Sequence, residues 1–147
     1  MALVEHKKAR LNYEILEEFE AGLELLGGEV KSLRQGLGKL EGSHVVVRDG
    51  EAYLVGASIP AYQPANAPKG YDPERTRKLL LTKAEIIKLA GLEGQKGLTI
   101  VPLTVYAKGR VLKARVAAVR GRKAHDKRQA LKERDTKREI DRSLKNQ

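Results

Sequence analysis

The side chains of this chain that could perform chemistry are few, and their spacing favours binding over catalysis. The three histidines, His6, His44 and His125, lie far apart in the sequence, and cysteine is absent. The sequence contains no Gly-x-Ser-x-Gly motif of a serine nucleophile, and it contains no His-Glu-x-x-His motif or other metal-ligand spacing. Glu17 and Glu18 are adjacent, so on a strand they would point to opposite faces. The sequence therefore predicts no catalytic residue, no metal site and no cofactor.

Positive charge is the dominant chemical property of the chain. The formal net charge is +10 at pH 7, which favours a polyanionic partner, with nucleic acid expected before an anionic membrane surface. A basic solvated surface without a specific partner is the simpler alternative. No run of eighteen apolar residues is present, so no transmembrane helix is expected. The absence of cysteine fits a reducing compartment, and we expect a cytoplasmic protein.

The charge is concentrated in a C-terminal tail, residues 121–147. From Arg122 onward this segment holds ten Lys and Arg against five Asp and Glu. Its apolar residues are too sparse to offset the entropy of ordering it, so we expect the tail to be disordered when free. Asp126 and Gln129 have the spacing of a helix-capping pair. We therefore expect the tail to become helical against a polyanion.

The body, residues 1–120, has the pattern of a mainly β domain. Period-two alternation predicts strands at 11–25, 98–107 and 111–119, and Asp49-Gly50 predicts a hairpin between 44–48 and 51–55. Gly22 is a candidate bulge in the first strand.

Short helices are predicted from Leu26, ended by Gly36, and from Thr82 through Ala90, stopped by Gly91. Residues 2–10 are expected to form an arm, and the proline-rich segment 59–73 a long loop. About five strands and two helices suit a small antiparallel barrel of the OB type with short flanking helices.

Basic side chains of the body are placed where they could grip RNA. Arg75, Arg77 and Lys78 lie where the long loop enters the core, within reach of phosphates. Lys113 and Arg115 alternate with the apolar residues of the last strand, which predicts a wet basic face. Aromatic residues are few, so recognition is expected to use RNA shape and backbone more than splayed bases.

Five short segments occur in the order and at the spacing of one family: residues 20–22, 29–34, 75–81, 96–99 and 125–128. Through them the chain resembles the SmpB (SsrA-binding protein) family over nearly its whole length. The resemblance implies an OB-type barrel that binds the tRNA-like domain of transfer-messenger RNA (tmRNA, or SsrA RNA). It also implies delivery, with an elongation factor, to bacterial ribosomes stalled without a stop codon.

The resemblance also assigns residues to two binding surfaces. It places Glu20, Leu80 and Thr82 on the tmRNA-binding surface. It places residues 121–128 in a tail that enters the small-subunit decoding centre, and the remaining tail residues, up to 147, along the empty mRNA channel. The expected tmRNA contacts are Glu20, Lys31, Arg34, Arg75, Arg77, Lys78, Leu80 and Thr82. The expected ribosome contacts are Arg122, Lys123, His125, Asp126, Lys127, Arg128, Lys132 and Arg134.

Two other functions fit parts of this pattern. A general OB-type factor that binds ribosomes or RNA without tmRNA specificity would share the barrel and the charge. A basic structural protein that binds DNA or anionic lipid would share only the charge. Competition between RNAs separates the first from the tmRNA adaptor, and binding to duplex DNA or liposomes identifies the second.

Overall fold

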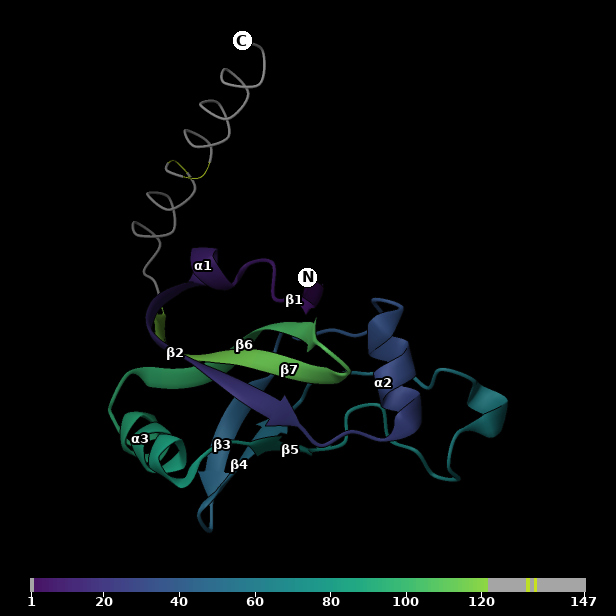
Figure 1. Cartoon of the computed structure of the whole chain (residues 1–147). Helices are drawn as coiled ribbons and strands as arrows, with labels where there is room; N and C mark the ends of the chain where they lie inside the picture. The colour runs from purple at the N-terminus through teal and green to yellow at the C-terminus, as the bar shows by residue number, and fades with distance from the viewer. Residues whose placement is uncertain (1, 122–131, 133, 135–147) are drawn as a thin grey trace.

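The computed structural model describes residues 2–121 together with Lys132 and Arg134 (Figure 1). Its centre is one antiparallel sheet of seven strands in the order β1-β6-β7-β2-β5-β4-β3. The strands are β1 Ala2–Glu5, β2 Tyr13–Leu23, β3 His44–Arg48, β4 Glu51–Val55, β5 Arg77–Leu80, β6 Leu98–Lys108 and β7 Val111–Gly121. The edge strand β3 also lies close to β6, so the sheet curls on itself. The predicted mainly β fold is confirmed.

Short helices flank this sheet. In the described part of the chain they are α1 Ala9–Asn12, α2 Gly27–Arg34 and α3 Lys83–Glu93, with a 3-10 turn, η1 Pro64–Asn66. Figure 1 shows α2 and α3 at opposite ends of the sheet, with the loop that carries η1 projecting beyond α2. No helix of the described residues is long and apolar enough to span a membrane.

The main core lies on the inner face of the sheet. Phe19 and Ala21 of β2 pack there with Leu79 of β5 and with Leu112 and Val116 of β7. On β7, the alternation that predicted this face is confirmed, because Leu112, Ala114, Val116 and Ala118 are all buried. The strand period therefore identified the inner face correctly.

A bulge in β2 moves its first residues to the other face. The pairing with β7 shifts between Ile15 and Glu17, where Leu16 is the extra residue. A one-residue bulge exchanges the faces of a strand, so Tyr13 and Ile15 pack in a second cluster with Ala117 and Val119. The prediction that residues 11–25 keep one apolar side is wrong. The bulge is at Leu16, and the candidate position Gly22 keeps its register.

The N-terminal segment is structured, contrary to the predicted arm. β1 pairs with β6, Val4 is buried in the main core, and the His6 amide donates to the Leu103 carbonyl over 2.8 Å. Ala9 of α1 then covers the second cluster. The short apolar run from Ala2 to Val4, followed by a basic stretch, gave too weak a strand signal, and the pairing partner lies a hundred residues later in the chain.

The local turn signals were mostly correct. Asp49 and Gly50 both have positive φ, of 52° and 76°, as a tight hairpin requires. Gly36 follows α2 with a φ of 76°. The predicted stop at Gly91 is wrong, because α3 continues to Glu93 and Leu92 packs against the core. Burial of that leucine outweighs the low helix propensity of glycine, about 1 kcal/mol.

Candidate nucleic-acid interface

The outer face of the sheet carries an open, charged surface across β6, β7, β2 and β5. Strand register places Tyr106, Lys113, Gly22 and Leu80 in one row across these strands. A neighbouring row holds Thr104, Arg115 and Glu20. We call this surface the sheet face.

Glycine at position 22 is explained by the close approach of Leu80. A Cβ at Gly22 would lie 3.1 Å from the Leu80 Cβ, so a larger residue would push β5 away. Leu80 is 50% exposed although it is apolar. The predicted site residue Leu80 therefore lies in the open, beside the charged rows of the sheet face.

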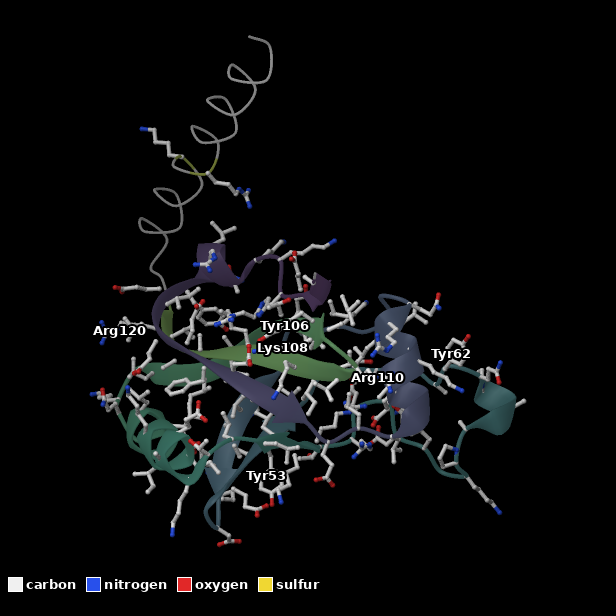
Figure 2. The ribbon with its side chains drawn as sticks, in the orientation of Figure 1. Tyr53, Tyr62, Tyr106, Lys108, Arg110 and Arg120 are labelled. Carbon is white, nitrogen blue, oxygen red and sulfur yellow. The ribbon has the colours of Figure 1, made fainter. Side chains whose placement is uncertain are left out.

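Glu20 is the centre of a polar cluster on the sheet face. Its carboxylate accepts a hydrogen bond from the Tyr106 hydroxyl and pairs with Lys108, with 3.0 Å between Oε1 and Nζ. The Arg115 guanidinium lies 5.9 Å from the centre of the Tyr106 ring. The hydrogen bond from Tyr106 and then that from Lys108 hold the pKa of Glu20 below its ordinary value. Figure 2 shows Tyr106 and Lys108 side by side on the sheet.

Lys78 and Thr82 extend this surface past β5. Lys78 pairs with Glu51 of β4, with Nζ 2.7 Å from Oε2, and that bond raises the pKa of the lysine. Thr82 caps α3 as predicted, because its hydroxyl accepts from the Glu85 amide over 3.2 Å. Both side chains are at least partly exposed, and both are already held by an intramolecular partner.

A second polar cluster lies inside the molecule and is centred on Glu29 of α2. The Glu29 side chain is 1% exposed and pairs with both Arg75 and Arg77. Tyr71 also reaches it, with its hydroxyl 3.1 Å from Oε2. Burial opposes ionisation of Glu29, but hydrogen bonds from Arg75, the Leu26 amide and Arg77 prevail, and its pKa lies below the ordinary value.

This cluster changes the role expected for Arg77. Its side chain is fully buried and donates to Glu29 and to the carbonyls of Ala57 and Pro73 over 2.8, 2.7 and 2.8 Å. A guanidinium enclosed in this way does not reach a phosphate, so the prediction that Arg77 grips RNA is corrected to a structural role. Arg75 shares the cluster but keeps 30% of its side chain exposed.

The basic residues of α2 lie apart from the sheet face. Arg34 donates to the Arg110 carbonyl over 3.2 Å, which ties α2 to the turn between β6 and β7. The Lys31 ammonium lies 5.9 Å from the centre of the Tyr62 ring. The predicted tmRNA contacts therefore separate into an outer group, an α2 group and an internal group.

Most of the predicted ribosome contacts lie outside the described residues. Of that set, Lys132 and Arg134 are described, and both are exposed and helical. The remaining predicted contacts are Arg122, Lys123, His125, Asp126, Lys127 and Arg128, which the structure does not describe.

Sequence reasoning missed four members of these clusters: Glu29, Tyr71, Tyr106 and Lys108. Glu29 follows Leu26 at the spacing of a capping pair, and its carboxylate does accept from the Leu26 amide over 2.8 Å, so its position could have been found. Its pairing with arginines 46 and 48 residues later could not. Among the described residues, no group of three His, Asp or Glu is arranged to hold a metal ion.

Comparison with known proteins identifies the family. Residues 3–146 match the sequence profile of the family described as "SmpB protein". The SsrA-binding protein of Sulfurihydrogenibium sp. is 52% identical over 140 residues, covering 95% of this chain and 91% of that protein. The SsrA-binding protein of Synechococcus sp. strain JA-3-3Ab is 50% identical over 143 residues, covering 97% and 93%.

A solved structure is similar in both fold and sequence. It is described as "tmRNA-SmpB: a journey to the center of the bacterial ribosome", and one of its chains superposes with a TM-score of 0.70 at 44% identity, over 86% of this chain and 92% of that one. The chain therefore belongs to the SmpB family of SsrA-binding proteins.

Proposed function

We propose that this protein is an RNA-binding adaptor of ribosome rescue, which binds the tRNA-like domain of tmRNA and brings it to stalled bacterial ribosomes. The observation that carries the proposal is membership of the SmpB family over nearly the whole chain. The proposed activity is binding, with no chemical step and no cofactor. Since its partner is the bacterial ribosome, the protein works in the cytoplasm.

The sheet face is the proposed tmRNA-binding surface of the body. Four of the expected tmRNA contacts lie on it or extend it: Glu20, Lys78, Leu80 and Thr82. The sheet face also carries three further cations: Lys108, Lys113 and Arg115. Lys31, Arg34 and the exposed part of Arg75 add positive charge at the α2 end of the molecule. These cations can exchange intramolecular carboxylates for phosphates at small cost, because exposed ion pairs are weak.

The tail is the proposed ribosome-binding element. Residues 121–128 enter the decoding centre of the small subunit, and the remainder to residue 147 becomes helical along the empty mRNA channel. The channel has walls of RNA, so a basic segment is attracted to it by counterion release. An elongation factor delivers the complex in this proposal.

The test of RNA specificity is a competition gel shift with the tRNA-like domain of tmRNA at about 0.15 M salt, where non-specific phosphate binding is weakened. Excess ordinary tRNA is expected to leave the complex in place. Equal displacement by tRNA would instead indicate a general RNA-binding factor of the same fold. Equal displacement by duplex DNA or by anionic liposomes would indicate binding by charge alone.

Truncation after Arg120 tests the division between body and tail. The shortened protein is expected to keep its affinity for the tRNA-like domain and to lose tagging of stalled peptides, because the body retains the sheet face and the ribosome loses its contact. The measurements are the same gel shift and a tagging assay on ribosomes programmed without a stop codon. Equal loss of both activities would contradict the division of labour.

A further inference from the structure

A groove separates the start of α2 from the projecting loop of residues 61–71. Its volume is about 360 Å³, within the range of about 300–1,000 Å³ for small-ligand clefts. Leu26, Gly28, Glu29, Lys31, Tyr62 and Tyr71 are among the residues that line it. Figure 1 shows α2 and this loop at the end of the sheet opposite α3.

The groove presents apolar and aromatic surface that the fold leaves uncovered. Tyr62 is 39% exposed and Leu26 is 41% exposed. Figure 2 shows Tyr62 between α2 and the projecting loop. An exposed aromatic ring that lines a cleft is a surface on which an unpaired base can stack.

Positive charge accompanies this aromatic surface. The Lys31 ammonium lies near the Tyr62 ring, at 5.9 Å from its centre. Beside the groove, Arg75 and Arg77 face the Glu29 carboxylate, and the negative charge of Glu24 also acts on Arg75, so these charges are balanced within the fold. Lys31 therefore supplies the positive charge that complements a phosphate group.

The walls of the groove are held in place by internal hydrogen bonds. The Tyr71 hydroxyl lies 2.7 Å from the Ile59 carbonyl and 3.1 Å from Glu29, and the Ser32 hydroxyl donates to the Pro60 carbonyl over 2.6 Å. These contacts tie the loop to α2. A preformed cleft loses less entropy on binding than one that must order first.

From this geometry we propose that the groove binds one unpaired nucleotide of the RNA partner, with its base stacked on Tyr62 and its phosphate paired with Lys31. The inference rests on the proposed RNA-binding function and adds a site for a single-stranded residue. It differs from the sheet face, which is broad and open. A base held in a duplex is stacked on its neighbours and does not enter the groove.

The direct test is fluorescence of Tyr62→Trp, since the chain has no other tryptophan. Titration with a single-stranded adenylate octamer is expected to quench the emission, because a stacked base quenches indole. A duplex RNA carrying the same number of phosphates is expected to quench much less. Equal quenching by both RNAs, or by neither, would overturn the proposal.

Substitutions of the two contact residues separate stacking from charge. Tyr62→Ala is expected to weaken binding of the tRNA-like domain about tenfold, the usual effect of losing one stacked base, and Tyr62→Phe to retain most of the affinity. Lys31→Gln is expected to lower the slope of log affinity against log salt by about 0.7–0.9, the value for one phosphate contact. Unchanged affinity in Tyr62→Ala would count against the site.

The substitution Gly28→Glu is designed to block the groove while leaving the stability of the fold unchanged. A Cβ at Gly28 meets nothing within 4 Å, and its φ is not positive. Glutamate is a better helix former than glycine and is favoured in the first turn, so the variant should be at least as stable as wild type. It is expected to bind RNA less tightly, because a negative charge enters the groove. Gln95→Glu, an exposed residue just beyond α3, is the matched control and should retain affinity.

The outcomes distinguish this inference from the proposed function. If the wild-type protein does not select the tRNA-like domain over tRNA, the proposed function fails. If it does, while Gly28→Glu and Gln95→Glu bind alike and Tyr62→Trp is not quenched, only the groove proposal fails. Loss of ribosome binding in Tyr62→Ala with normal affinity for the tRNA-like domain would assign the groove to a ribosomal contact and overturn the site for a tmRNA nucleotide.

Discussion

Two clusters in this protein each combine one glutamate, one tyrosine and two cationic side chains, and one cluster lies inside the molecule while the other lies outside. In the inner cluster, Glu29 contacts Tyr71, Arg75 and Arg77. In the outer cluster, Glu20 contacts Tyr106 and Lys108, and Arg115 lies against the Tyr106 ring. The Glu29 side chain is 1% exposed and that of Glu20 is 32% exposed. Burial is therefore the main difference between them.

That difference decides what each cluster can do. Inside, the carboxylate has lost its water, and two guanidiniums must replace it. The cluster then fixes α2 to the loop and to β5, and its charges are committed to one another. In the outer cluster, water solvates and screens every charge, so each ion pair is weak and its cation can pair with another anion instead. The inner cluster stabilises the fold, and the outer cluster is suited to binding RNA.

The largest expected effect on stability follows from Glu29→Gln. Removing this charge leaves two arginines without their counterion, one of them fully buried, and breaking a buried pair costs about 3–5 kcal/mol. The free energy of unfolding, measured by urea denaturation, is expected to fall by about that amount. Glu20→Gln is the matched control and is expected to leave the urea midpoint close to that of wild type. Similar midpoints for the two variants would contradict the assignment of roles.

The inner cluster also marks where prediction from the sequence failed. Arg75, Arg77 and Lys78 look alike in the sequence, as a basic run before an apolar one. Nothing local says that Arg77 points inward, because its partner Glu29 is brought to it only by the fold. The prediction that Lys113 and Arg115 lie outside was correct, because the alternation of apolar and polar residues within one strand is enough to tell which side chains face the core.

Acid is expected to weaken the inner cluster. The pKa of Glu29 is lowered in the folded protein, so its contribution is fully present above its unfolded pKa, about 4.3. The contribution is lost as pH falls through the folded value. Urea midpoints of wild type and Glu29→Gln, measured from pH 7 downward, are therefore expected to converge below about pH 4.3. A constant difference between them would show that Glu29 stabilises the fold through packing alone.

The two tyrosines give a smaller and more local comparison. Tyr71→Phe removes a hydroxyl that lies near Glu29, the Ile59 carbonyl and Arg77, and it should lower the free energy of unfolding by about 1–3 kcal/mol. Tyr106→Phe removes a hydroxyl from the open sheet face and should change the free energy less. Hydrogen exchange of the loop between Ile59 and Pro73 is expected to accelerate only in Tyr71→Phe. Equal changes in both variants would mean that burial does not separate the clusters.

The β2 bulge explains why the sequence predicted only in part which side chains of β2 lie on the outer face of the sheet. Alternation alone placed Tyr13 and Phe19 on one side, yet they lie in different clusters because Leu16 is inserted between them. The same insertion puts Glu18 and Glu20 on the outer face. Leucine and glutamate carry no local signal for a bulge, so the register had to come from pairing with β7.

The smallest effect on stability and the most informative effect on binding are expected from Glu20→Gln. The carboxylate holds Tyr106 and Lys108 in one arrangement, and it also offsets one positive charge of the sheet face. Without it the face is more basic and less ordered, so affinity for any RNA should be kept or raised while selectivity falls. In the competition gel shift, ordinary tRNA is expected to displace the tRNA-like domain several-fold more effectively than from wild type.

Glu41→Gln separates selectivity from simple charge. Residue 41 is exposed and lies in the segment between α2 and β3, so this variant removes one negative charge away from the sheet face. If ordinary tRNA displaces the tRNA-like domain from this variant as readily as from Glu20→Gln, net charge explains the loss of selectivity and the outer cluster has no specific role. If only Glu20→Gln loses selectivity, an acidic residue on a basic face is there to position cations, which its buried counterpart Glu29 does for the fold.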